Sequence, residues 1–219
     1  MIAPTPAISA ADRLPPSPAL PGFEHVRRNW NARLSAYAAR ILPGEYYVTK
    51  DDEAVGTTLG SCVAACIRDR VRGIGGMNHF MLPASAGESD DCKAAGLGSA
   101  TRYGNYAMEH LINEIMRNGG RRDDLEVKIF GGGRILGQLT DVGARNIAFV
   151  RDYLRAEGFK AAAEDLGDVY PRMVIYFPAS GVAKVKRLRS LHNNMIAGQE
   201  ASYAGSIAAR PVGGDVELF

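Results

Sequence analysis

Two side chains of this chain could form a nucleophile and base pair: a cysteine and a histidine seventeen residues apart. Cys62 follows Gly60 and Ser61, which permit a sharp turn whose backbone N–H groups could converge on one spot. His79 stands in the segment Asn-His-Phe-Met-Leu-Pro. A thiolate attacks acyl carbon atoms, and a neighbouring imidazole can take the thiol proton. The pattern raises the hypothesis of covalent catalysis, provided that the fold brings the two side chains together.

The segment that holds this pair is predicted to be a β-hairpin with the four-residue loop 69–72. If Arg68 pairs with Gly73 across the loop, paired positions sum to 141, and Cys62 then lies opposite His79. Directly opposite side chains share one face of a sheet, with Cβ atoms about 4.5–5.5 Å apart. A one-residue slip would place His79 on the other face. The proposed pair therefore depends on the register of this hairpin.

Other roles remain open for the same residues. A free cysteine in a strand is often a small buried hydrophobe, and a histidine on an apolar strand is often a core residue. Cys66 is predicted to pack in the core, and Cys92 lies beside two aspartates, which raise a thiol pKa. A zinc site from Cys62, Cys66, His79 and Cys92 lacks the usual ligand spacing. We expect no metal.

The composition is that of an ordinary globular chain. The 219 residues include 26 basic and 24 acidic side chains, a net charge of +2, and 46% are hydrophobic. This charge gives no sign of nucleic-acid binding. The chain has no run of about 18 apolar residues, so we expect no membrane span. The Pro-rich N-terminus lacks the apolar segment of a secretory signal. Three cysteines favour a reducing compartment, so we expect a cytoplasmic protein.

The pattern along the chain predicts a leader and one α/β domain. Residues 1–22 are rich in Pro and Ala, and apolar residues at three- and four-residue steps predict an amphipathic helix over 23–41. We therefore divide the chain into 1–43 and a domain at 44–219. The predicted strands are 46–49, 55–59, 63–68, 73–82, 125–130, 160–166, 172–177, 182–186 and 212–219, the helices are 103–116 and 146–157, the long loop is 84–100, and the ambiguous helical insert is 192–209.

Three glycines follow the predicted strand 125–130, at positions 131–133. They lack the remaining residues of a phosphate-binding loop. We expect a tight turn or a close backbone approach near the site instead.

Several segments together resemble a known family. Thr-Leu-Gly-Ser-Cys-Val at 58–63 and Met-Asn-His-Phe-Met-Leu-Pro at 77–83 resemble the active-site region of the CheD-type chemoreceptor glutamine deamidases, and similarity extends over roughly 44–219. The resemblance implies a compact four-layer α/β/β/α fold with mixed sheets. That fold is shared with the deamidating domain of cytotoxic necrotising factor toxins.

The resemblance also implies the roles of the site residues. Cys62 would be the nucleophile, and His79 would take its proton. Thr57 would orient the imidazole, with Thr58 as the alternative. The Gly-Ser turn before the cysteine would stabilise an oxyanion. A Cys62 thiol of low pKa should then react with alkylating reagents well before Cys66.

The activity implied is hydrolysis of glutamine side chains to glutamate on methyl-accepting chemotaxis receptors, a protein-glutamine glutaminase reaction through a thioester. Glutamyl methyl esters would react by the same route, and no cofactor is implied. The implied partners are the cytoplasmic domain of such receptors and, in some organisms, a CheC-type response-regulator phosphatase. Two other classes remain open: a non-catalytic chemotaxis adaptor, and a different Cys–His hydrolase such as a protease or transglutaminase.

Overall fold

The fold consists mainly of strands. The computed structural model describes residues 15–83, 99–135, 142–188 and 193–209. The strands are β1 (Arg28–Asn31), β2 (Ala36–Arg40), β3 (Tyr46–Thr49), β4 (Ala54–Leu59), β5 (Val63–Asp69), β6 (Gly75–Asn78), β7 (Leu125–Gly131), β8 (Ala161–Leu166), β9 (Arg172–Phe177) and β10 (Val182–Arg187). The helices are α2 (Ser99–Arg117), η2 (Arg122–Asp124), α3 (Val142–Ala156) and α4 (Asn193–Ala209).

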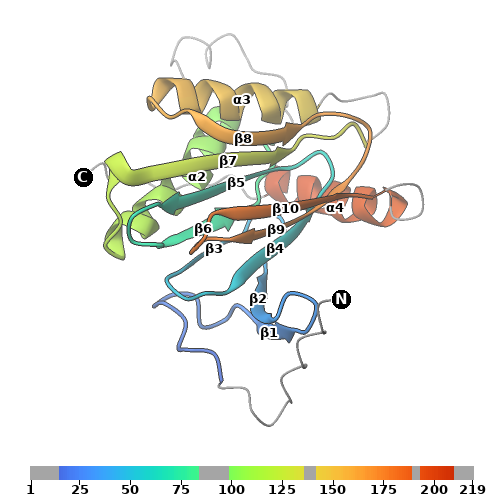
Figure 1. The fold of residues 1–219 in the computed structure, drawn as a ribbon. Helices are drawn as coiled ribbons and strands as arrows, with labels where there is room; N and C mark the ends of the chain where they lie inside the picture. The colour runs from blue at the N-terminus through green and yellow to red at the C-terminus, as the bar shows by residue number, and fades with distance from the viewer. Residues whose placement is uncertain (1–14, 84–98, 136–141, 189–192, 210–219) are drawn as a thin grey trace, which may run out of the picture.

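The strands form two five-stranded sheets. Sheet A has the order β1-β2-β4-β9-β10, and sheet B has the order β3-β6-β5-β7-β8. Each sheet contains a parallel pair among antiparallel ones, β2 with β4 and β7 with β8. The expected α/β class with mixed sheets is therefore confirmed (Figure 1).

Helices α2 and α3 lie on one face of sheet B, and sheet A packs on its other face (Figure 1). The helix α2 buries an apolar stripe that includes Met108, Leu111 and Ile115. It ends at Arg117, and Gly119 just beyond it has a positive φ of 102°, which suits a glycine cap. On the opposite face of sheet B, Lys128 of β7 donates to the Gly181 carbonyl oxygen next to β10. The core thus lies in two layers, one on each face of sheet B.

The amphipathic helix predicted over 23–41 is wrong. The segment forms β1 and β2, an antiparallel pair in which the rings of Trp30 and Tyr37 make an edge contact at 5.4 Å. Strand β2 then pairs in parallel with β4. Aromatic cross-strand packing and pairing with a sheet edge outweigh the helical spacing of the apolar residues. As a result, Ile41 enters the core directly beside β4.

Most other predicted elements are confirmed within a few residues. The strand predicted over 73–82 is shorter and ends at Asn78, and the insert at 192–209 is largely the helix α4. The leader residues 1–14, almost all of the loop predicted over 84–100, and the strand or tail at 212–219 lie outside the described residues, as does Cys92.

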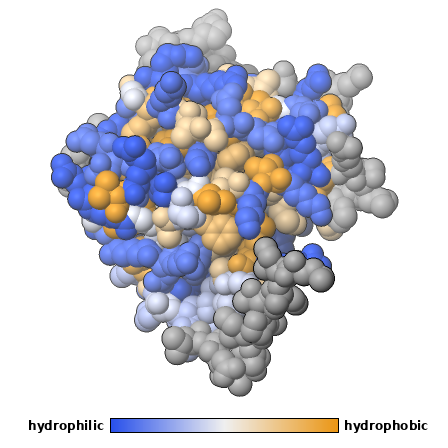
Figure 2. All heavy atoms as spheres, viewed as in Figure 1, coloured by the Kyte–Doolittle hydropathy of each residue, from blue (hydrophilic) through white to orange (hydrophobic). Residues whose placement is uncertain are grey.

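The outer face of sheet A carries a mixed surface. Met173 of β9 and Val182 of β10 are exposed apolar side chains, and Lys184 lies over the ring of Phe177 at 5.3 Å. Figure 2 shows apolar side chains near the centre of this view with hydrophilic ones around them. Among the described helices, none combines the length and the apolar character needed to span a membrane.

Candidate active site

The hairpin that carries the cysteine and the histidine has a register different from the predicted one. Arg68 pairs with Gly75 rather than with Gly73. The difference of two residues leaves every side chain on its predicted face, because side chains alternate with a period of two. Cys62 and His79 therefore share one face as diagonal rather than direct neighbours.

The longer loop has a specific cause at the end of β5. The buried carboxylate of Asp69 accepts the N–H groups of Val71 and Arg72 at 2.8 Å and that of Arg121 at 2.9 Å. Burial by itself raises the pKa of Asp69, but the hydrogen bonds from the backbone of Arg72 and Arg121 lower it to about 2. The ionised carboxylate thus fixes a wider turn than the four-residue loop that was assumed.

The turn between β4 and β5 has all of its carbonyl groups held on one side. The donors are the backbone N–H groups of two glycines and the side-chain amide of a buried asparagine. The pairs are Gly133 N with Gly60 O at 2.7 Å, Asn146 Nδ2 with Ser61 O at 2.8 Å, and Gly132 N with Cys62 O at 2.7 Å. The N–H groups of the same turn are therefore free to point in the other direction, toward α4.

The glycines after β7 make this arrangement possible. Gly131 and Gly132 have φ values of 113° and 69°, in the region that favours glycine. A Cβ atom on Gly131 would overlap the carbonyl oxygen of Cys62. The close backbone approach predicted for 131–133 is confirmed.

The N–H groups of the turn converge on one carboxylate, that of Glu200 in α4. Oxygen Oε1 accepts from Gly60 N at 2.8 Å and Cys62 N at 3.1 Å, and Oε2 accepts from Ser61 N at 2.7 Å and Ser61 Oγ at 2.6 Å. Three successive backbone donors and one hydroxyl thus form an anion-binding site beside the thiol.

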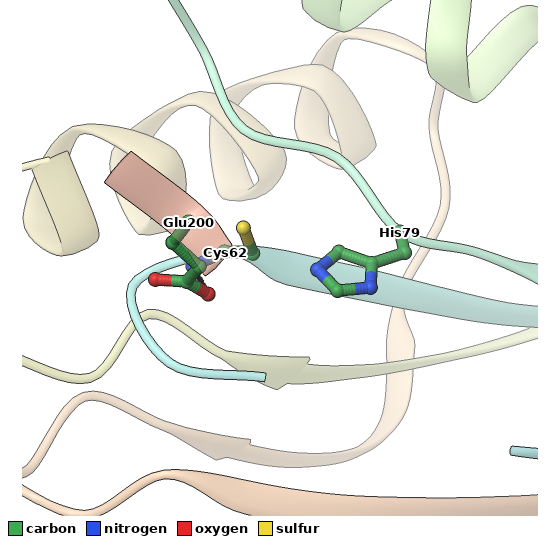
Figure 3. A group of neighbouring side chains, drawn as sticks. All are labelled: Cys62, His79 and Glu200. Carbon is green, nitrogen blue, oxygen red and sulfur yellow. Dashed lines mark hydrogen bonds between the residues drawn. The ribbon is translucent and has the colours of Figure 1, made fainter. Parts of the chain in front are cut away.

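His79 lies between the cysteine and a threonine. The hydroxyl of Thr57 donates to the carbonyl oxygen of Ile41 at 2.9 Å, and Nδ1 of His79 lies 2.8 Å from the same hydroxyl oxygen. Because the hydroxyl proton is used, Nδ1 carries the proton and donates it to Thr57. Nitrogen Nε2 then has a free lone pair, and it is buried without a hydrogen-bond partner. Figure 3 shows the ring turned with one nitrogen toward Cys62.

Of the two candidate threonines, the fold brings only Thr57 to His79. Residues alternate along β4, and Thr57 is buried between the sheets while Thr58 is only partly buried. Thr58 pairs with Met173, whose side chain is exposed on the outer face of sheet A. The structure thus brings together Cys62, His79 and Thr57 with the turn at 60–61.

The cysteine and the histidine are both neutral in this conformation. Burial, followed by the negative charge of Glu200, raises the pKa of Cys62 well above its ordinary value. Burial lowers the pKa of His79 to about 4, although the charge of Glu200 acts in the opposite direction. The expectation of a low-pKa, readily alkylated Cys62 is therefore wrong for the state described. The pKa of buried Cys66 is also raised by burial, and this residue packs in the core as predicted.

The buried imidazole predicts an acid-labile fold. In the unfolded chain the pKa of His79 returns to about 6.5, so its stabilising effect is complete above that pH and is lost as the pH falls through 4. We expect about 3 kcal/mol of unfolding free energy to be lost from this group between pH 7 and pH 4. Urea denaturation at several pH values would measure it. A His79→Asn variant should lose correspondingly less, and an equal loss would contradict the assignment.

One group of side chains in the described part of the chain has the composition of a metal site: Cys62, His79 and Glu200, with one possible ligand atom from each within 4.8 Å of the others. The geometry at Glu200 fits a metal poorly, because both carboxylate oxygens already accept two hydrogen bonds each from the turn. Cys66 is not part of this group. The donor set therefore favours anion binding by the turn over metal binding.

Asn146 of α3 positions the site from behind. It is fully buried, donates to Ser61 O and accepts the N–H of Leu82 at 2.9 Å. Asn146→Ala should cost about 2–3 kcal/mol of unfolding free energy, since two backbone groups lose their partner. It should also lower kcat, because the turn loses one of its three anchors. Asn118→Ala in the half-buried turn after α2 is a control for kcat; equal kcat in both variants would contradict a positioning role.

Three contributors to the site were not predicted from the sequence. Glu200 lies in the segment that was ambiguous, yet Ile196 and Ile207 share its buried face at helical spacing. That pattern is a signal that the helix face is buried, although not of what it covers. Asn146 and the carbonyl group of Ile41 act through hydrogen bonds that join distant segments, and no local pattern marks them.

Comparison with known proteins identifies the family. A family model described as CheD chemotactic sensory transduction matches residues 81–187. Many similar proteins carry the name "Probable chemoreceptor glutamine deamidase CheD", and three of them illustrate the similarity. That of Halorhodospira halophila is 52% identical over 91% of this chain and 93% of its own length.

The other two are comparably similar. The relative from Hahella chejuensis is 50% identical over 94% of this chain and 96% of its own length, and that from Hydrogenovibrio crunogenus is 53% identical over 82% and 93%. In all three comparisons the similarity covers most of this chain and nearly all of the relative. The chain belongs to the CheD family.

Proposed function

We propose that this protein is a chemoreceptor glutamine deamidase that hydrolyses the side-chain amide of receptor glutamines to glutamate. The observation that supports this most directly is the arrangement of Cys62, His79 and Thr57 beside an anion-binding turn, in a chain of the CheD family. A primary amide is a weak electrophile, so it needs a strong nucleophile and a stabilised oxyanion. The site offers both within a buried environment.

Acylation uses the lone pair on Nε2 of His79. This nitrogen takes the proton of the Cys62 thiol as sulfur attacks the amide carbon, so the pair need not be ionised beforehand. The N–H groups of Gly60, Ser61 and Cys62 stabilise the oxyanion. The imidazolium then gives its proton to the departing nitrogen, the C–N bond breaks, and ammonia leaves a thioester.

Deacylation follows the same path with water. Nε2 of His79 removes a proton from water, whose oxygen attacks the thioester carbon. The C–S bond breaks, the imidazolium returns its proton to the sulfur, and the thiol and glutamate remain. A glutamyl methyl ester would enter by the same route, with methanol as the leaving group. Throughout, the Thr57 hydroxyl oxygen accepts a hydrogen bond from Nδ1–H of His79 and holds the ring orientation.

Thr57 can be tested separately as a positioning residue. In Thr57→Val the hydroxyl is lost while the shape is kept, so Nδ1 and the Ile41 carbonyl oxygen lose their partner. We expect kcat to fall by about 10–100-fold through the weaker ring orientation. Thr57→Ser should retain most of kcat because the hydroxyl remains. The neighbouring Thr58→Val is a matched control, and a comparable loss there would contradict the assignment.

The proposed reaction is tested directly by mass spectrometry. A receptor cytoplasmic fragment incubated with the protein should gain about 1 Da for each glutamine converted. The reaction run in ¹⁸O-labelled water should add about 2 Da more per site, since the new oxygen comes from water. No mass change with several receptors, under conditions where the protein is folded, would leave the adaptor as the better hypothesis.

The remaining parts of the proposal concern location and partners. The receptor segment that is modified would be the helical cytoplasmic part, so the enzyme would act in the cytoplasm. A CheC-type phosphatase stays a prediction from the resemblance. Association of the two purified proteins, measured by calorimetry, would test it.

A further inference from the structure

Helix α4 places a glutamate inside the catalytic centre. Figure 3 shows the side chain of Glu200 beside Cys62, with His79 on the other side of the thiol. The turn at 60–62 donates four hydrogen bonds of 2.6–3.1 Å to the carboxylate of Glu200. A carboxylate oxygen, the sulfur of Cys62 and a ring nitrogen of His79 lie within 4.8 Å of one another. The carboxylate therefore occupies the position in which the carbonyl oxygen of a substrate would be stabilised.

The helix also closes the site. The exposed fractions of Cys62, His79 and Glu200 are 0%, 1% and 1%. A glutamine on another protein needs contact between its amide carbon and the thiol sulfur, and no such contact is possible at these exposures. The conformation described is thus one in which the nucleophile and base are assembled but inaccessible.

The covering group has the chemistry of the reaction product. A glutamate side chain is what remains when a glutamine has lost ammonia and taken up water. Here it is borne on a helix, as the modified residue of a receptor helix would be. Its negative charge against the turn mimics the charge that develops on the substrate oxygen.

We propose that α4 is an internal inhibitor which binds the catalytic centre as the product helix does, through Glu200, and which a receptor helix must displace. The inference rests on the proposed function for the identity of the competing helix. The inference that α4 covers the thiol does not depend on the proposed function.

The rest of α4 is built so that the helix can dissociate from the catalytic centre. Over residues 195–207, where the burial of α4 is described, the buried side chains lie on one narrow face, at Ile196, Glu200 and Ile207. Gly198 and Gly205 lie inside the helix, and a Cβ atom on either would meet nothing within 4 Å. Packing therefore does not require these glycines, and each weakens the helix by about 1 kcal/mol relative to alanine. A competing helix can therefore displace α4 more readily than it could displace a helix with strong helix-forming residues at these positions.

The surface beneath α4 defines where the competing helix would lie. Tyr203 of α4 hydrogen-bonds through its hydroxyl to that of Tyr103 in α2. A Cβ atom on Gly44 would overlap the Tyr203 ring, so Gly44 leaves the space that the ring fills. Gly44, Tyr103 and the turn thus form the surface on which α4 places the Glu200 carboxylate beside Cys62, and a receptor helix would take the same surface.

The first test measures access to the thiol. In the full-length protein, Glu200→Ala removes the four hydrogen bonds and leaves the turn donors unpaired while α4 is bound. We expect iodoacetamide to alkylate Cys62 about 10–100-fold faster than in the unchanged protein. Gln199→Ala, an exposed neighbour, is the matched control and should change nothing. Buried Cys66 reports unfolding, since it should stay unmodified.

The second test uses a variant that keeps the size of the side chain. In Glu200→Gln the sulfur of Cys62 should bond to the introduced amide carbon, the C–N bond breaks, and ammonia leaves with a proton from His79. Water then attacks the thioester carbon, the C–S bond breaks, and the new oxygen comes from water. The residue at this position should then be recovered as glutamate, about 1 Da heavier than the encoded glutamine. The same variant with Cys62→Ala should keep its glutamine.

The outcomes separate the two proposals. Faster alkylation of Cys62 and faster receptor deamidation by Glu200→Ala support the inhibitor. If the protein deamidates a receptor, but the glutamine of Glu200→Gln persists and alkylation is unchanged, the inference is overturned while the enzyme stands. If alkylation accelerates but neither the receptor nor the introduced glutamine is hydrolysed, α4 covers the thiol and the deamidase proposal fails. Should Cys66 react as fast as Cys62 in Glu200→Ala, the conversion of glutamine to glutamate in Glu200→Gln decides.

Discussion

Cys62→Ser is expected to lower kcat for glutamine deamidation by at least about 10⁴-fold, as loss of a covalent nucleophile does in other hydrolases. The base in this site is neutral, with a pKa of about 4 in the conformation described. A base this weak removes the proton of a thiol far more readily than that of the much less acidic serine hydroxyl. The amide carbon would then meet a hydroxyl instead of a nucleophilic thiolate. Receptor mass spectrometry at matched protein concentrations measures the loss.

A matched control lies four residues further along the chain, in β5. Cys66 is as fully buried as Cys62, but it is not part of the cluster with His79. Cys66→Ser should cost about 1–2 kcal/mol of stability by burying a hydroxyl, yet the folded fraction should keep its kcat. If Cys62→Ser retained a tenth of the activity, or Cys66→Ser lost as much, the nucleophile would have been misassigned.

Periodicity was a good guide where an element is built from its own residues. The stripe of α2 and the alternation of β7 both mark one buried face, and both elements formed where predicted. It failed at 23–41 because the apolar residues there are buried by another element. Strand β2 exists because the edge of β4 is available to it, and nothing within 23–41 indicates that edge.

In the candidate site, too, some residues could be predicted from local sequence and others could not. Cys62 and His79 were predicted as a pair on an assumed register that was wrong by two residues, and the pair survived because the error was even. The choice of Thr57 over Thr58 needed the burial pattern of β4. Glu200 is 138 residues from Cys62 in the chain. Its presence at the thiol follows from how α4 returns to the turn, which is a property of the tertiary fold alone.

His79→Asn is expected to lower kcat by about 10³–10⁴-fold, near the upper end of what a general base contributes. Asparagine keeps the hydrogen bond to Thr57 and removes the nitrogen that faces the thiol. Its amide N–H can donate to Thr57 Oγ1 from near the position of Nδ1. No atom of asparagine reaches the place of Nε2, which is the nitrogen that must take the thiol proton. The variant therefore removes the base while keeping the hydrogen bond that positions it.

The same variant separates catalysis from stability. At pH 7, His79→Asn should fold with nearly unchanged unfolding free energy, because the buried hydrogen bond to Thr57 is kept. On acidification it should lose less stability than the unchanged protein, since no imidazole becomes protonated. His110→Asn in α2 provides the control, as His110 contacts Tyr106 and Tyr46 rather than the thiol. Full activity in His79→Asn would show that the thiol loses its proton to another group, and the role of the Thr57–His79 pair would then be structural.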